Sequence, residues 1–286
     1  METKKKVSVA DILGTKNKEK IAVLTAYDYS TALICDRAGV DVLLVGDSAG
    51  MVVLGYSNTA PVGMPEMLMF CGAVSRGAKK AMVVGDMPFG SYQPNPSMAV
   101  ANAVQFIKAG CDAVKLEGGL EISSTVRAIV DAGIPVMGHI GLKPQTASLW
   151  EGYRMQGGTR LSANKLIEDA KALEKAGAFS IVLEMVASEV AMEITKRMAV
   201  PTIGIGSGAG CDGQVLVLHD MLGIYEDIKP RFVKRYAELS KTIVEAVSRF
   251  SQEVKTGKFP EESNTFHMKP EELTELREAL KVSKKK

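Results

Sequence analysis

Eight short apolar runs, most of them rich in β-branched residues, alternate with segments of helical length along this chain. Ala-Gly pairs precede four of these runs, and a glycine in the left-handed conformation is a common end of a helix. Such nearly continuous apolar runs are typical of strands buried on both faces of a parallel sheet. The runs are IAVLTAYD (21–28), DVLLVGD (41–47), AMVVGDM (81–87), DAVKLEG (112–118), IPVMGHIG (134–141), FSIVLEMV (179–186), PTIGIGSG (201–208) and QVLVLHD (214–220).

The number and spacing of these runs predict an α/β fold, the (β/α)8 TIM barrel. Such a barrel typically needs about 250 residues, and the chain has 286. An open doubly wound sheet is the alternative. It would have fewer strands and a glycine fingerprint after the first one, where this chain instead has Ala26-Tyr27-Asp28.

The two ends of the chain are expected to be accessory to the barrel. Residues 1–20 should form a short N-terminal helix that closes the barrel floor, and 231–254 should be the last long helix. We assign residues 1–264 to a catalytic barrel domain. Residues 265–286 are assigned to a polar C-terminal tail that either belongs to the same domain or is disordered.

Composition and charge exclude two classes of partner. Lysine plus arginine number 35 against 33 for aspartate plus glutamate, so no basic footprint indicates nucleic acid or a membrane surface. No apolar run is long enough for a membrane span, and no apolar core of a secretory signal follows the basic start. The four cysteines are scattered without a Cys-x-x-Cys pair, which is typical of reduced thiols in a cytoplasmic protein.

Most of the runs end in ionisable residues. The carboxyl ends of the strands of a parallel barrel meet at one rim, where the active site lies. Asp47, Asp86 and Glu117 come from three consecutive strands, so we expect them to converge there. Converging carboxylates repel one another unless a cation intervenes, and oxygen ligands favour a hard ion such as Mg²⁺ over Zn²⁺. The alternative is that each acid pairs with a basic residue or caps a helix.

Lys115 lies two residues before Glu117 on the same predicted strand, so both side chains should point to the same side. Three roles are open for this lysine: it could neutralise the acids, bind an anionic substrate, or form a Schiff base. We favour anion binding beside a metal, because nearby acids keep the amine protonated and poorly nucleophilic.

The later strands contribute a candidate base. Glu184 ends an apolar stretch, and an apolar setting raises the pKa of a carboxyl toward neutrality, which suits a general base. A salt bridge or a helix cap is its alternative role. His139 could orient a substrate or a carboxylate, or it could be a core histidine. His219 and Asp220 carry a weaker signal, since Asp220 could simply cap the next helix.

Seven segments form a pattern that runs from about Val7 to near Met268 without a large gap. They are LTAYDYSTA (24–32), LLVGDSAGMVVLGY (43–56), VVGDMPFGSYQ (83–93), AVKLEGG (113–119), VMGHIGLKPQ (136–145), GIGSGAGCDGQVLVLHDMLG (204–223) and PRFVKRY (230–236). In this order they resemble the ketopantoate hydroxymethyltransferase (3-methyl-2-oxobutanoate hydroxymethyltransferase) family of pantothenate biosynthesis. Only the stretch after Met268 departs from the family pattern.

The resemblance implies a (β/α)8 barrel in which the same three carboxylates hold Mg²⁺. It implies that Ser48 and Lys115, together with Asp47 and Asp86, bind the α-keto acid and that Glu184 is the catalytic base. The reaction would transfer a hydroxymethyl group from 5,10-methylenetetrahydrofolate to 3-methyl-2-oxobutanoate through a metal-stabilised enolate, giving 2-dehydropantoate. Family members form homo-oligomers, often decamers, so a homo-oligomer acting on small molecules is expected.

Two other functions compete with this interpretation. A Mg²⁺-dependent carbon–carbon lyase on a similar barrel would cleave an α-keto or hydroxy acid and would need no folate. A metabolite-binding scaffold without turnover would bind the keto acid but exchange no proton. The complete set of rim residues argues against the scaffold.

Overall fold

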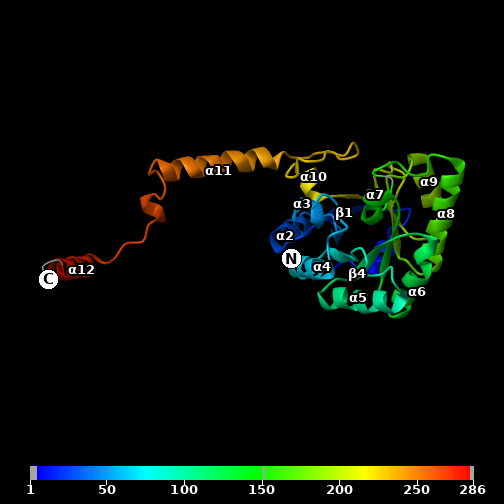
Figure 1. Cartoon of the computed structure of the whole chain (residues 1–286), viewed down its shortest axis with the longest axis horizontal. Coiled ribbons are helices and arrows are strands. Elements are labelled where there is room, and N and C mark those ends of the chain that lie inside the picture. Colours follow the sequence, from blue (N-terminus) through cyan, green and yellow to red (C-terminus); the bar gives the residue numbers. More distant parts are fainter. Residues whose placement is uncertain (1–4, 151, 284–286) are drawn as a thin grey trace. The chain divides into compact units, whose positions relative to one another are not determined.

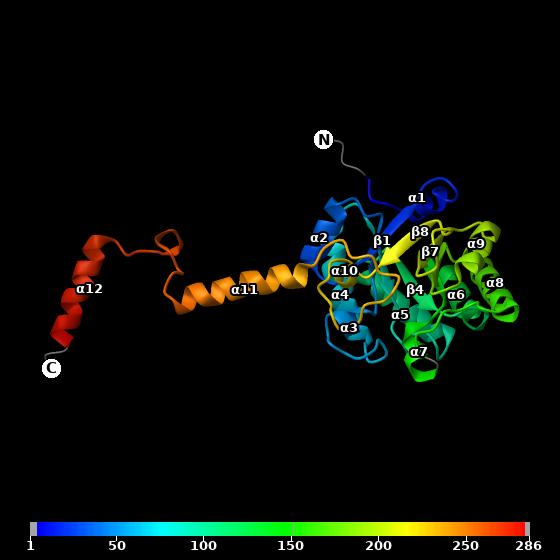
Figure 2. The ribbon, with the colours of Figure 1, turned by 90° about the horizontal axis from the view of Figure 1, so that it is seen from above.

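Eight parallel strands close into a barrel in sequence order, and β8 pairs back to β1. The computed structural model describes residues 5–150 and 152–283, and Figures 1 and 2 show the barrel from two sides. The predicted (β/α)8 barrel is therefore confirmed. Its strands are β1 (Ile21–Thr25), β2 (Val42–Val45), β3 (Met82–Asp86), β4 (Ala113–Glu117), β5 (Val136–Gly141), β6 (Ser180–Glu184), β7 (Thr202–Ile205) and β8 (Gly213–Leu216).

Helices lie around the outside of the strands (Figure 2). The start of α5 follows from local sequence, because the Asn95 side chain accepts from the Met98 backbone N–H and Pro96 occupies the first turn. In the described part of the chain no helix has the length and apolar character of a membrane span. The helices of residues 1–237 are α1 (Val9–Gly14), α2 (Tyr29–Arg37), α3 (Ala49–Val52), α4 (Met64–Gly77), α5 (Pro96–Lys108), 3-10 helix η1 (Leu120–Ile122), α6 (Ser123–Asp131), α7 (Pro144–Trp150), α8 (Arg160–Lys175), α9 (Ser188–Arg197) and α10 (Leu218–Met221).

Apolar side chains along most strands alternate between two clusters. On β2, Leu43 and Val45 belong to the cluster between strands and helices, whereas Val42 and Leu44 belong to the cluster inside the barrel. Ile12 of α1 joins the inner cluster, so this helix closes the barrel floor as the sequence predicts. The alternation determines which residues at the strand ends point into the barrel mouth.

Residues 238–286 form a second compact unit. It contains α11 (Leu239–Lys255), 3-10 helix η2 (Glu262–Asn264) and α12 (Pro270–Ser283). The α11 residues Ile243, Val247, Phe250 and Val254 share one helical face, and the Phe250 ring packs edge-on against Phe259 with centroids 5.5 Å apart. The structure groups the chain as 1–237 and 238–286, while the assignment of 1–264 to the catalytic domain stays a prediction.

The predicted start of the last long helix is wrong. The helix begins at Leu239, and residues 231–238 form turns and bends. Two contacts explain the difference. The Tyr236 backbone N–H donates to the Met221 carbonyl and not to a carbonyl of its own segment. The Phe232 ring packs closely on Gly206: a Cβ added to Gly206 would lie 2.9 Å from that ring. This segment is therefore tied to the barrel mouth.

Candidate active site

Four ionisable side chains lie buried together inside the carboxyl end of the barrel. Lys115 of β4 pairs in register with Asp86 of β3, and Glu117, two residues further along β4, pairs with His139 of β5. The Lys115 Nζ is 2.7 Å from Asp86 Oδ1, 3.2 Å from His139 Nδ1 and 3.9 Å from Glu117 Oε1. Lys115 and Glu117 both point into the barrel, as their spacing predicts.

The single ammonium does not balance the acids around it. Burial raises the pKa of Asp86 to about 7, with Asp47 adding to the effect and Lys115 opposing it. Burial also raises the pKa of Glu117 well above its usual value. Burial alone would lower the pKa of Lys115, but attraction by Asp86, Glu117 and Asp47 raises it instead. The lysine therefore stays charged in a site with an excess of negative charge.

Asp47 and Ser48 follow β2 and face the cavity above these four residues. The Asp47 backbone N–H donates to Asp86 Oδ2 at 3.2 Å, which joins the two acids. The Asp47 Oδ2 atom is buried and has no hydrogen-bond partner among the described residues. The Ser48 hydroxyl lies 2.8 Å from the Tyr27 hydroxyl. A buried carboxylate oxygen without a partner, on a residue that lines a cavity, calls for a ligand.

Glu184 ends β6 and lines the same cavity. Burial raises the pKa of its carboxyl to about 7, and Lys115 opposes the rise. The next residue, Met185, has a φ of +48°, which costs a non-glycine residue about 1 kcal/mol or more. Hydrogen bonds from Met185 N to the Ile205 carbonyl and from Gln156 N to the Met185 carbonyl hold it there. The backbone turn therefore fixes where the Glu184 carboxyl points.

His139 connects Glu184 to the buried ionic group. Burial and the neighbouring Lys115 both lower the pKa of His139, so the ring is neutral. An ammonium can only donate, so Nδ1 accepts from Lys115 and the ring proton lies on Nε2. The Nε2 atom is 3.3 Å from Glu184 Oε2, but the two are not aligned as a hydrogen bond. The Nε2–H is therefore a potential donor close to the Glu184 carboxyl.

Two uncharged residues complete the support of Glu117. The Tyr92 hydroxyl accepts from the Glu117 backbone N–H at 3.1 Å and donates to Gln145 Oε1 at 2.8 Å. The Gln145 backbone N–H donates to Glu117 Oε2 at 3.2 Å. Our sequence analysis did not single out these two residues, because it followed ionisable groups at strand ends. Tyr92 lies in the loop after β3, and Gln145 is in α7.

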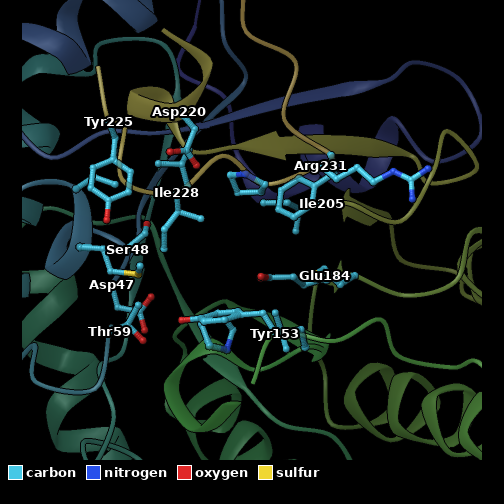
Figure 3. Close-up of a pocket in the computed structure, with 18 residues that line it drawn as sticks. Asp47, Ser48, Thr59, Tyr153, Glu184, Ile205, Asp220, Tyr225, Ile228 and Arg231 are labelled. Atoms are coloured by element: carbon cyan, nitrogen blue, oxygen red, sulfur yellow. The ribbon is translucent and has the colours of Figure 1, made fainter. Parts of the chain in front are cut away.

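A cavity of about 360 Å³ opens above the group. Asp47, Ser48 and Glu184 lie on its walls, and Figure 3 shows the Glu184 carboxyl pointing into it. Asp86, Lys115, Glu117 and His139 lie deeper; each is at most 6% exposed. Aromatic and aliphatic side chains form most of the remaining wall; Tyr153, Tyr225, Ile228 and Phe232 are among them. The site thus combines an ionic floor with an apolar entrance.

The donor set suits a hard cation. Asp86 and Glu117 share one ammonium, and Asp47, which lines the cavity, has a buried Oδ2 without a hydrogen-bond partner. Within residues 5–150 and 152–283, no three His, Cys, Asp or Glu side chains are arranged as a ready metal cage. Mg²⁺ does not need one, because it commonly binds one or two carboxylates and completes its shell with water and substrate oxygens. The residues fit such an ion in charge and ligand type.

The fold and these residues define a (β/α)8-barrel enzyme with a buried acidic site at the carboxyl ends of its strands. The model of the ketopantoate hydroxymethyltransferase family matches residues 6–262. A 3-methyl-2-oxobutanoate hydroxymethyltransferase of Cenarchaeum symbiosum is 61% identical over 88% of this chain and 96% of that protein. One of Nitrosopumilus maritimus is 57% identical over 96% of this chain and 98% of its own length.

Solved structures with this architecture are more distant. Phosphonopyruvate hydrolase is 12% identical with a TM-score of 0.60 and covers 97% of each chain. A 2,3-dimethylmalate lyase is 16% identical with a TM-score of 0.57 and covers 97% of this chain and 98% of its own. These likenesses show the fold alone. The family match and the close relatives show that the chain belongs to the ketopantoate hydroxymethyltransferase family, transferases that act on 3-methyl-2-oxobutanoate.

Proposed function

We propose that this chain makes 2-dehydropantoate by transferring a hydroxymethyl group from 5,10-methylenetetrahydrofolate to 3-methyl-2-oxobutanoate, with Mg²⁺ bound at the acidic site. The observation that supports it most is the pairing of two features in one cavity. Glu184 has a carboxyl pKa of about 7, and Asp47 presents an unpartnered oxygen. A base poised near neutrality beside a site for a chelating keto acid suits removal of a proton next to a carbonyl.

The acidic residues would hold the ion and orient the keto acid. Asp47, Asp86 and Glu117 are the ligands that we propose. Bound Mg²⁺ would supply positive charge at the keto and carboxylate oxygens of the substrate, which lowers the barrier to its enolate. Ser48 would donate to a substrate oxygen at the cavity wall. Lys115 would add positive charge from below while it keeps Asp86 and His139 in place.

Glu184 would remove the proton from C3 of the keto acid. The electron pair left on C3 would then form the new carbon–carbon bond to the methylene carbon of the folate, which becomes an iminium carbon when its bond to N10 breaks. Water would replace N5 on that carbon and supply the hydroxyl of the product. The protons from C3 and from water would end on N5 and N10 of the departing tetrahydrofolate. The neutral His139 would donate from Nε2 to the Glu184 carboxylate and so orient it before the proton is taken. Assembly as a homo-oligomer, up to a decamer, and a cytoplasmic location also stay predictions.

A product assay tests the proposal. The purified chain is incubated with 3-methyl-2-oxobutanoate and 5,10-methylenetetrahydrofolate labelled with ¹³C at the transferred carbon, and 2-dehydropantoate is measured by mass spectrometry. We expect one labelled carbon in the product, no product without the folate, and loss of product with EDTA that excess Mg²⁺ restores. Cleavage of the keto acid without folate would contradict the proposal and favour the lyase. Full activity in EDTA would exclude the metal.

A further inference from the structure

Asp220 is a cavity-lining acid that the proposed chemistry leaves without a role. It follows β8 in α10 and is half-buried. Among the described residues its carboxylate has no hydrogen-bond or ion-pair partner. Arg235 lies close enough to attract it, although burial still raises its pKa to about 6. The sequence left open that Asp220 caps a helix, but no side-chain cap is present at the start of α10.

The wall beside Asp220 is apolar, aromatic and held in place. Tyr225 and Ile228 line the cavity on this side, and Figure 3 shows Ile228 between Asp220 and the centre of the cavity. The Ile224 backbone N–H donates to the His219 carbonyl at 2.9 Å, and Arg235 Nη2 donates to the Tyr225 carbonyl at 3.3 Å. These bonds fix the segment after α10, so the wall is formed before any ligand arrives.

A flat ring with a pair of neighbouring N–H donors fits this wall. The pterin of tetrahydrofolate carries such an edge, the N3–H and the 2-amino group, which matches the two oxygens of a carboxylate. The ring itself can pack against aromatic and aliphatic side chains. Asp47 and Glu184 are engaged in the keto-acid chemistry, so Asp220 is the lining acid that remains for this edge.

We propose that Asp220 binds the 2-amino-4-oxo edge of the folate pterin, with Tyr225 and Ile228 packed along the ring. This inference rests on the proposed function, because it assigns the folate part of that reaction. In Figure 3 Arg231 lies on the other side of the cavity from Asp220, and the Glu184 carboxyl points into the cavity below them. The exposed guanidinium of Arg231 would meet the glutamate carboxylates of the folate, so the one-carbon unit would lie near Glu184.

The test compares Asp220→Asn with Glu226→Gln. Glu226 is an exposed acid of the same segment that does not line the cavity, so its variant is the charge-matched control. Binding of tetrahydrofolate and, separately, of 3-methyl-2-oxobutanoate with Mg²⁺ is measured by calorimetry. In Asp220→Asn we expect at least tenfold weaker tetrahydrofolate binding, because the asparagine amide faces the ring donors with a donor of its own. Keto-acid binding reports that the variant is folded, and Glu226→Gln should bind like the wild type.

A ligand change makes the test specific to the pterin edge. An analogue of tetrahydrofolate with a methyl group in place of the 2-amino group should lose affinity for the wild type but not for Asp220→Asn. The analogue could lose equal affinity for the wild type and for Asp220→Asn, or Asp220→Asn could bind tetrahydrofolate as tightly as the wild type. Either result would overturn the assignment of Asp220 to the pterin edge and leave the proposed function in place. No tetrahydrofolate binding by the wild type would instead overturn the folate part of the proposed function, and this inference with it.

Discussion

Acids are buried at both ends of the barrel, and their surroundings differ. At the amino ends, Asp36 accepts hydrogen bonds from the backbone N–H groups of residues 79–81 at 2.7–3.0 Å. Asp212 pairs with Lys16 at 2.8 Å and accepts from the Thr202 N–H at 2.8 Å. Each of these two acids connects segments that are distant in the sequence, and the donors offset the energetic cost of burying its carboxylate.

At the carboxyl ends the compensation is incomplete. Asp47 keeps a buried oxygen without a hydrogen-bond partner, and Asp86 and Glu184 have carboxyl pKa values near 7. Buried carboxylates therefore stabilise the fold where hydrogen bonds and ion pairs compensate their charge, and they are available for catalysis where such partners are missing. We therefore expect substitutions at the amino ends to change mainly stability and substitutions at the carboxyl ends to change mainly activity.

The largest effect is expected for two lysines that pair with acids, buried Lys115 in the mouth and half-buried Lys16 at the other end. Lys115→Met leaves the acids of the mouth without their cation, so kcat/KM should fall by about 1000-fold or more. Lys16→Met removes the partner of Asp212 at the other end and should lower the free energy of unfolding by about 3 kcal/mol. Its folded fraction should keep the wild-type kcat/KM. Steady-state assays and urea unfolding measure both. Similar losses of kcat/KM in the two variants would contradict the separation of catalytic acids at the carboxyl ends of the strands from structural acids at the amino ends.

The next effect concerns one acid from each end. Asp47→Asn should lower kcat/KM by about 100-fold without lowering the free energy of unfolding, because it removes an uncompensated buried charge. Asp36→Asn should lower the free energy of unfolding by about 1–3 kcal/mol, because three backbone donors lose a charged acceptor. Thermal and urea unfolding with activity assays distinguish them. A strong loss of stability in Asp47→Asn would show that Asp47 is a structural acid.

A smaller effect is expected for His139. His139→Ala removes the Nε2–H beside Glu184, so kcat should fall about tenfold. Loss of this donor should also raise the pKa of Glu184 and shift the pH profile of kcat upward. His139→Gln, which keeps an N–H group, should recover part of kcat. A fall in kcat with an unchanged pH midpoint would indicate that His139 only packs.

The last prediction needs no substitution and concerns the pH dependence of the wild-type base. A general base works when ionised, so the rate of C3 proton exchange should rise about tenfold per pH unit below 7 and level off above. The folded pKa of Glu184 lies above its unfolded value of 4.5, so its contribution to stability is present below pH 4.5 and lost as the pH rises through 7. Glu184→Gln should remove this part of the pH dependence of unfolding. A rate that is flat from pH 5 to 8 would argue against Glu184.

The sequence predicts the barrel and the residues of its mouth because both follow from local patterns. Apolar runs give the strands, and the residue after each run must lie at the rim. The two-residue spacing of Lys115 and Glu117 places both inside the barrel. Which acid Lys115 contacts most closely depends on the register between β3 and β4, and that is a long-range property.

Loops account for what the sequence does not predict. Tyr92 supports Glu117 from a loop, where no periodicity places it. Phe232 forms part of the cavity wall, although its segment has the helical pattern that we predicted to begin at 231. Contacts with Gly206 and Met221 outweigh the local helical preference there. Loop side chains are positioned by tertiary packing, and a single sequence carries little record of that packing.

Whether Glu184 takes the proton from C3 of 3-methyl-2-oxobutanoate can be measured as proton exchange at that carbon. The keto acid and Mg²⁺ are followed by ¹H NMR in D₂O without folate, with wild type and with Glu184→Gln, which keeps the shape of the side chain but cannot take a proton. We predict rapid exchange by the wild type and at least 1000-fold slower exchange by Glu184→Gln, with keto-acid binding retained. Exchange by Glu184→Gln at the wild-type rate would contradict the account.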